Sequence, residues 1–228
     1  MINFELEKQK GLLYAQMPEH KALVAKTKGF VKWALGKVKN PYVACSFGKD
    51  SAVMLHLVLQ FNPDIDVRFV RWQNETEYLA NYNEVINEWG KLNLTQIELS
   101  RTSLGDKRKE RYSTDGYDSY FIGFRSDESK GRRISLKKDG IFYKMKEGKI
   151  RISPISEWKV KDVVAYTFSN NLPILDTYEK YGFEERTTSR IPREDFGIRS
   201  HSLKLLKNKN MAAYNQLSNH FPEIGLYV

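Results

Sequence analysis

Residues 42–59 read YVACSFGKDSAVMLHLVL, and this stretch decides the fold that the sequence predicts. The apolar run at 42–45 is typical of a short buried strand, and the run at 52–59 is typical of a buried helix. Between them lies a six-residue turn, Ser46-Phe47-Gly48-Lys49-Asp50-Ser51. A helix that begins directly after a strand presents backbone N–H groups and the positive end of its dipole to the turn. The stretch therefore predicts an anion-binding loop.

The polar side chains of this turn strengthen the prediction. Lys49 adds a full positive charge, and Ser46 and Ser51 add hydroxyl donors. Asp50 either caps the helix or helps to hold a metal ion, and the residues alone leave both readings open. A Walker A loop would need a glycine at the position of Val43 and a Ser or Thr directly after the lysine. We therefore expect a phosphate loop of another kind.

The segments that follow extend this unit into an open sheet. Strands are predicted at 66–72 and 94–99, with an amphipathic helix at 76–92 between them. The strand–helix–strand–helix–strand order over 42–99 is typical of parallel strands joined by right-handed crossovers. In such sheets ligands bind at the carboxyl ends of the strands, where the phosphate loop would lie.

Other elements are predicted on either side of this unit: a helix at 18–38, a strand at 120–123, a hairpin at 141–155 that turns at Glu147-Gly148, helices at 159–170 and 211–217, and a loop at 182–200. We expect one α/β domain over 1–228, with an open, mainly parallel sheet, helices on both faces and a small C-terminal extension. That extension, residues 180–228, is interpreted either as a lid over the site or as a solvated tail. It contains four arginines: Arg186, Arg190, Arg193 and Arg199.

The composition narrows the class of protein. Of 228 residues, 41% are hydrophobic and 13% aromatic, enough for a packed core. No apolar run approaches the ~18 residues of a membrane span, and the start MINFELEKQK lacks the apolar segment of a signal peptide. One cysteine cannot form an internal disulfide or a cysteine-based metal site. We expect a cytoplasmic protein with no membrane partner and no protein-held metal cluster.

The positive charge is concentrated in one region. The chain carries a net charge of +9, and residues 125–151 contribute ten basic side chains against four acidic ones. This region is interpreted either as a solvated surface or as a face that binds anions such as nucleotides or nucleic acid.

The turn at 46–51 strongly resembles the PP-loop of the ATP pyrophosphatase superfamily. Its variant is most similar to that of the phosphoadenylyl-sulfate (PAPS) reductase family, which includes the small subunit of sulfate adenylyltransferase. Two further segments resemble motifs of this family: Gly123-Phe124-Arg125 followed by Glu128-Ser129 and Arg132, and Pro154 followed by Trp158 and Asp162-Val163. The resemblance covers about residues 40–178.

The resemblance implies a fold like that of the adenine nucleotide alpha hydrolases and an adenine nucleotide, ATP or PAPS, as the ligand, with Mg²⁺ sharing the phosphate charge. It implies that Lys49 and Arg125 are catalytic and that Arg125 and Arg132 face an anionic group of the ligand. The expected binding residues are Ser46, Phe47, Gly48, Lys49, Asp50, Ser51, Arg125 and Arg132.

The sequence also departs from the family. Reductases of this family use a C-terminal cysteine as nucleophile, whereas no cysteine follows Cys45 here, and Cys45 is expected to be a small buried side chain. The family's Asp-Thr-Gly after the second strand is replaced by Arg71-Trp72-Gln73-Asn74, and Glu75 behind it is only a candidate general base. Trp158 is expected to pack in the core.

Three functions are compatible with these residues. The first is an enzyme that cleaves ATP between the α and β phosphates, adenylylates an unidentified acceptor and releases pyrophosphate. The second is a protein that handles PAPS or adenylyl sulfate without a reducing cysteine of its own. The third is a nucleotide- or nucleic-acid-binding module without turnover, which the basic region at 125–151 suggests.

Overall fold

The computed structural model describes residues 3–72, 81–99, 116–184, 203–204, 206–208, 211–220 and 222–228. Its centre is a six-stranded sheet with the order β3-β2-β1-β4-β6-β5. The strands are β1 (Pro41–Ala44), β2 (Asp66–Trp72), β3 (Leu94–Leu99), β4 (Ser119–Ile122), β5 (Phe142–Lys144) and β6 (Ile150–Ile152).

The sheet confirms the predicted open α/β fold with mainly parallel strands. β1 pairs in parallel with β2 on one side and with β4 on the other, and β2 pairs in parallel with β3. β6 is parallel to β4, and only β5 runs antiparallel, because it forms a hairpin with β6. The hairpin turns at Gly148, whose φ of 85° is a conformation that favours glycine.

The helices agree with the predicted ones in type but differ at their ends. Those expected from the sequence are α2 (Pro18–Leu35), α3 (Lys49–Leu59), α4 (Tyr82–Glu88), α7 (Val160–Ser169) and α10 (Met211–His220), which the 3₁₀ helix η1 (Pro222–Tyr227) follows. α2 ends before the predicted residue 38, since Gly36 caps it. α3 begins at Lys49, three residues before the apolar run over 52–59 and close to the start expected at about Asp50 or Ser51, so Lys49, Asp50 and Ser51 form its first turn.

Helices that were not predicted include, among the described residues, α1 (Phe4–Ala15), α6 (Lys130–Asp139) and α8 (Asp176–Tyr181). α6 falls in the basic region, where charged side chains conceal the helical period and only Leu136 is buried. Its N-cap is Ser129, whose Oγ accepts a hydrogen bond from the Arg132 backbone N–H at 3.2 Å. The basic region is therefore an ordered helix and a hairpin.

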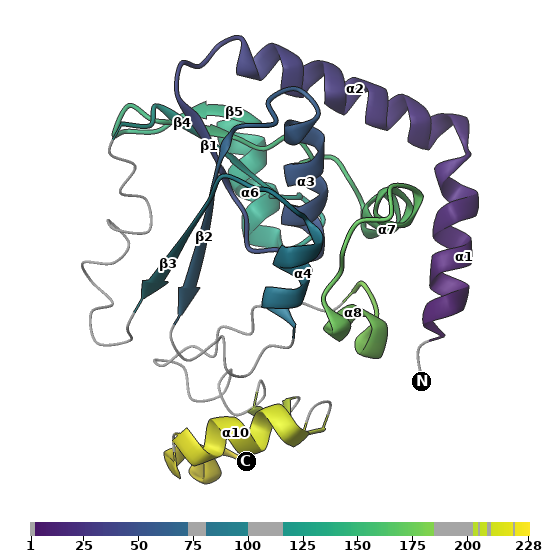
Figure 1. Cartoon of the computed structure of the whole chain (residues 1–228), viewed down its shortest axis with the longest axis vertical. Helices are drawn as coiled ribbons and strands as arrows, with labels where there is room; N and C mark the ends of the chain where they lie inside the picture. The colour runs from purple at the N-terminus through teal and green to yellow at the C-terminus, as the bar shows by residue number, and fades with distance from the viewer. Residues whose placement is uncertain are drawn as a thin grey trace.

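The strand order decides where the helices lie. The chain moves from β1 to β2 in one direction along the sheet and from β4 to β6 in the other. Right-handed crossovers therefore place α3 on one face and α6 on the opposite face. β2 and β3 point toward the end of the molecule where α8 and α10 are drawn (Figure 1). The carboxyl ends of the parallel strands are thus on the side from which α3 begins.

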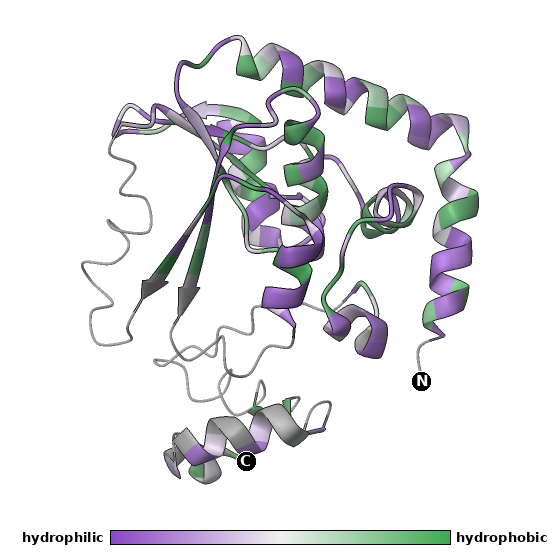
Figure 2. Cartoon of the chain, viewed as in Figure 1, coloured by the Kyte–Doolittle hydropathy of each residue, from purple (hydrophilic) through white to green (hydrophobic). Residues whose placement is uncertain are grey.

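The main core joins the sheet to α2, α3, α4 and α7. Fully buried residues come from β1 (Val43), α3 (Val53, Leu57), β2 (Val67) and α7 (Val163). Hydrophilic and hydrophobic residues alternate along α2 (Figure 2), as expected of a helix that covers a core with one face. Trp158 is fully buried, as predicted, and its Nε1–H donates to Thr27 Oγ1 at 2.9 Å.

The C-terminal segment has a small hydrophobic cluster of its own, formed by Leu203, Tyr214 and Ile224. The predicted loop at 182–200 and the four arginines within it lie outside the described residues, apart from 182–184. The lid over 180–228 therefore stays a prediction. In the described part of the chain, no helix has both the length and the apolar character that crossing a bilayer requires.

Gly123, directly after β4, lets that strand approach the start of α3. A Cβ at this position would lie 2.9 Å from the carbonyl C and O of Asp50 and from the backbone N of Ser51. These are backbone atoms, so a side chain at position 123 would displace the first turn of α3.

We expect Gly123→Ala to lower the free energy of unfolding by about 1–3 kcal/mol, the usual cost of overpacking. The matched control is Gly131→Ala in α6, where a Cβ meets nothing within 4 Å and alanine favours the helix. Urea denaturation of both variants measures the difference. Equal stabilities would contradict the close approach of β4 to α3.

Candidate functional site

The loop between β1 and α3 bends at Phe47. This residue has a φ of 53°, which is uncommon outside glycine and is expected in a tight turn. Its ring is buried and packs edge-on against Phe69 of β2, with the centroids 5.2 Å apart. Burial of the ring therefore compensates for the unfavourable backbone conformation and holds the loop against the sheet.

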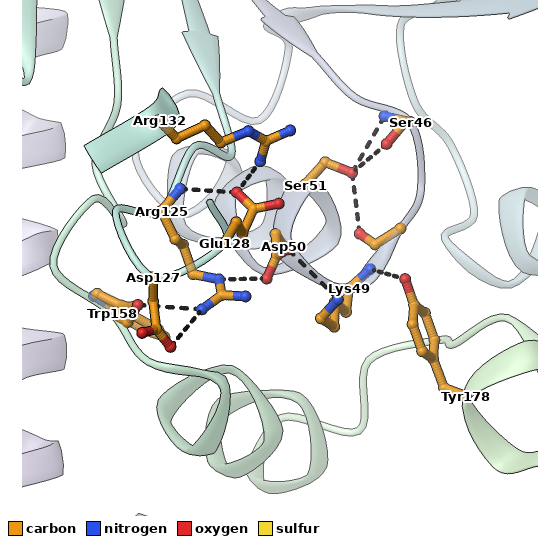
Figure 3. A network of polar contacts seen from close by, with 11 residues as sticks. Ser46, Lys49, Asp50, Ser51, Arg125, Asp127, Glu128, Arg132, Trp158 and Tyr178 are labelled. Carbon is orange, nitrogen blue, oxygen red and sulfur yellow. Dashed lines mark hydrogen bonds and ion pairs between the residues drawn. The ribbon is translucent and has the colours of Figure 1, made fainter. Parts of the chain in front are cut away.

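Two serines close the loop on itself, as Figure 3 shows. Ser51 Oγ accepts a hydrogen bond from the Ser46 backbone N–H at 3.2 Å and lies 3.1 Å from Ser46 Oγ. It donates to the carbonyl oxygen of Gly48 at 3.0 Å. Both hydroxyls, predicted as ligand donors, thus also fix the shape of the loop.

The first turn of α3 supplies the amides that an anion would use. The Gly48 carbonyl accepts from the Ala52 N–H at 2.9 Å, which begins the helical ladder. Among the described residues, the backbone N–H groups of Gly48, Asp50 and Ser51 have no recorded hydrogen-bond partner. Such amides, together with the helix dipole, favour a bound anion.

Tyr178 of α8 reaches the same turn, and the sequence analysis did not identify it. Its hydroxyl accepts a hydrogen bond from the Lys49 backbone N–H at 3.0 Å, and Lys49 Nζ lies 5.4 Å from the centre of its ring. Tyr178 is buried and stacks on Phe183. Tyr178 belongs to no motif of the loop, because it lies 129 residues after Lys49 in the sequence.

Asp50 joins the loop to the segment after β4. Its Oδ1 accepts a hydrogen bond from Arg125 Nε at 2.7 Å, and its Oδ2 lies 3.7 Å from Lys49 Nζ (Figure 3). Arg125 is only 1% exposed. Its Nη1 also donates to the Trp158 carbonyl at 3.3 Å and lies 3.7 Å from Asp127 Oδ2. Arg125 thus links three segments of the chain around the loop.

A second ion pair supports the same segment. Glu128 Oε2 accepts from the Arg125 backbone N–H at 3.0 Å and pairs with Arg132 Nη1. The Arg132 guanidinium lies 4.5 Å from the centre of the Phe124 ring. The structure therefore brings Arg125 and Arg132 to the segment beside the loop, while their predicted contact with a nucleotide stays a prediction.

Magnesium in nucleotide sites is commonly held by one or two carboxylates together with the phosphates. No group of three or more His, Cys, Asp or Glu side chains gathers in the described part of the chain. Asp50, the metal candidate from the sequence, faces Arg125 and Lys49. The capping reading of Asp50 is wrong, because the N-cap of α3 is Gly48 and no side chain caps the helix there. The contacts of Asp50 with Arg125 and Lys49 instead position the loop.

Cys45 lies directly before the loop and is buried. Burial raises the pKa of its thiol to about 12, although a hydrogen bond from the Phe47 backbone N–H acts in the opposite direction. The thiolate, which is the reactive form, is therefore scarce near neutral pH. The expected buried, unreactive role of Cys45 agrees with this position, whereas Glu75, the candidate base, lies outside the described residues.

Comparison with known proteins gives a family and a fold. The model of the phosphoadenosine phosphosulfate reductase domain matches residues 40–117 and 106–225. Adenosine 5'-phosphosulfate reductase from Bacillus cereus is 24% identical over 198 residues, covering 76% of this chain and 81% of that protein. Phosphoadenosine 5'-phosphosulfate reductase from Xylella fastidiosa is 27% identical over 180 residues, covering 66% of this chain and 72% of that protein.

A solved structure shows the same fold. FMN adenylyltransferase from Candida glabrata, in complex with FMN and the ATP analog AMPCPP, aligns with a TM-score of 0.57 and 15% sequence identity. The alignment covers 78% of this chain and 69% of that chain. At this identity the likeness concerns the arrangement of strands and helices.

The Asp50–Arg125 pair predicts a specific pattern of stability. Arg125→Met should lower the free energy of unfolding by about 3 kcal/mol, because it leaves the Asp50 carboxylate buried without its closest cation. Asp50→Asn combined with Arg125→Met should cost less than the sum of the two single changes. Denaturation of the four proteins in a double-mutant cycle measures this coupling, and strictly additive losses would show that the two side chains do not interact.

The buried thiol gives a second expectation. At about pH 8, a pKa of about 12 leaves roughly one thiol in 10⁴ as thiolate, so iodoacetamide should alkylate the native protein far more slowly than the urea-unfolded protein. Mass spectrometry of timed samples follows the reaction. Rapid alkylation of the native protein would mean that Cys45 is accessible and reactive.

Proposed function

Since the chain belongs to the phosphoadenosine phosphosulfate reductase domain family, we propose that it binds ATP through residues 46–51 and transfers the adenylyl group to an acceptor. The observation that carries the proposal is the first turn of α3, where three amides without a recorded partner in the described residues lie beside the buried Lys49. This arrangement suits the phosphate chain of a nucleotide.

The reaction requires one bond to form and one to break. An oxygen of the acceptor attacks the α-phosphorus, the bond from that phosphorus to the bridging oxygen of the β-phosphate breaks, and pyrophosphate leaves with the electron pair. If the attacking group is a hydroxyl, its proton passes to a base or to water. The acceptor receives AMP, and no oxidant or reductant is needed.

The chain contributes mainly electrostatics and positioning in this proposal. The amides of Gly48, Asp50 and Ser51 and the charge of Lys49 hold the β- and γ-phosphates and stabilise the leaving pyrophosphate. Arg125 holds the side chain of Asp50, which lies in the first turn of α3. When Mg²⁺ is bound with the phosphates, it neutralises part of their charge.

The curated relatives favour a second candidate, a protein that handles a sulfonucleotide. Both reductases reported above are named for adenosine phosphosulfates. Cys45, however, is the one cysteine in these 228 residues, and it is buried with a raised thiol pKa. This argues against Cys45 as the nucleophile of a reductase. Thermal-shift measurements with matched concentrations of ATP and PAPS compare the two candidates, since the better ligand stabilises the fold more.

Turnover is tested by incubating the protein with α-labelled ATP, Mg²⁺ and candidate acceptors such as sulfate, tRNA or DNA. The proposal predicts pyrophosphate release together with transfer of the label to one acceptor. Tighter binding of PAPS than of ATP, with no pyrophosphate released in any mixture, would contradict it and favour the sulfonucleotide reading.

Lys49→Ala should weaken nucleotide binding by about 1–3 kcal/mol, the scale of one charge-assisted contact. The fold should remain intact, because most of the core lies in other elements. Isothermal titration calorimetry with the non-hydrolysable analogue AMPCPP measures the change. The matched control is Lys32→Ala, an exposed lysine of α2. Equal affinities of the two variants would show that the loop does not bind the phosphates.

A further inference from the structure

The outward face of α6 carries a stripe of positive charge that the proposed ATP chemistry does not use. Lys130, Arg133, Lys137 and Lys138 are all exposed, and the intervals between them are three, four and one residues. Residues three, four and seven apart share one face of a helix. Ile134, 57% exposed, lies among them on the same face. The helix therefore presents four cations on one side and buries Leu136 on another.

The acidic residues around α6 do not neutralise this stripe, because they pair with other cations. Glu128 pairs with Arg132, and Asp127 lies near Arg125. Asp139, the one carboxylate within α6, lies 3.4 Å from Arg151 Nη2. No ion pair is recorded for the four stripe cations in the described part of the chain.

Lys137 and Lys138 lie in the last turn of α6, where the helix dipole favours cations, but the start of the helix has no such explanation for its charge. The first turn of α6 contains Lys130 and no acidic residue. The helix macrodipole disfavours cations at this end. The charge at the start of α6 therefore does not serve the stability of the helix, whereas a bound polyanion would stabilise it.

We propose that this face of α6 binds the phosphodiester backbone of a nucleic acid. A ten-residue helix is about 15 Å long and can contact several successive phosphates. An anionic membrane fits less well, since a helix that lies in a membrane surface needs a continuous apolar face and this stripe has only Ile134. The proposal is independent of ATP turnover, so each can fail alone.

The test measures the salt dependence of binding to a fluorescent 20-mer, once as a single strand and once as a duplex. Lys130→Gln combined with Arg133→Gln removes two stripe charges. The matched control, Lys21→Gln with Lys32→Gln, removes two exposed charges from α2. Both double variants lower the net charge equally, and thermal melting should show that neither unfolds.

The wild-type protein is expected to bind with a steep negative slope of log K against log salt. The α6 variant should reduce the magnitude of that slope by about 1.8 on the duplex or about 1.4 on the single strand, and the control should keep the wild-type slope. The strand form with the tighter binding identifies the preferred ligand. Absence of oligonucleotide binding at low salt, equal slopes for both variants, or binding to phosphatidylserine vesicles alone would overturn the proposal.

Discussion

The ion pair between Asp50 and Arg125 is the contact on which the site depends. It joins the first turn of α3 to the segment after β4, and Arg125 also bonds the carbonyl of Trp158. Arg125 is almost fully buried, so the pair acts in an environment of low polarity, where leaving either charge alone is costly. The same contact holds the side chain of Asp50, which lies in the first turn of α3. The loop proposed to bind an anion is thus held by contacts among three segments that are far apart in the sequence.

Much of the fold could be predicted because its signals are local. The apolar runs of β1 and α3 bracket a polar turn, and the boundaries of β2 and β3 agree with the predicted 66–72 and 94–99. The helix α6 could not be predicted from a pattern of hydrophobic residues, because most of its side chains are lysines and arginines. Its buried apolar residue is Leu136. Composition alone cannot distinguish a charged helix from a charged loop.

Part of the candidate site could also be predicted, because some of its residues are neighbours in the sequence. The residues of the loop are contiguous, so the sequence displays them together, and the resemblance to a known family added Arg125 and Arg132. Contacts that depend on tertiary structure gave no such signal. Tyr178 of α8 contacts the Lys49 amide, and Asp50 contacts Arg125. Neither contact can be read from the spacing of residues in the sequence. The positive φ of Phe47 likewise follows from the packing of its ring against Phe69.

The central claim is that the loop at residues 46–51 holds the phosphates of a nucleotide. A crystal structure with AMPCPP and Mg²⁺ tests it most directly. The account predicts phosphate oxygens within hydrogen-bond distance, about 3 Å, of the backbone N atoms of Gly48, Asp50 and Ser51, with Lys49 Nζ beside them. A nucleotide bound with its phosphates elsewhere, and these amides still without an anion, would contradict it.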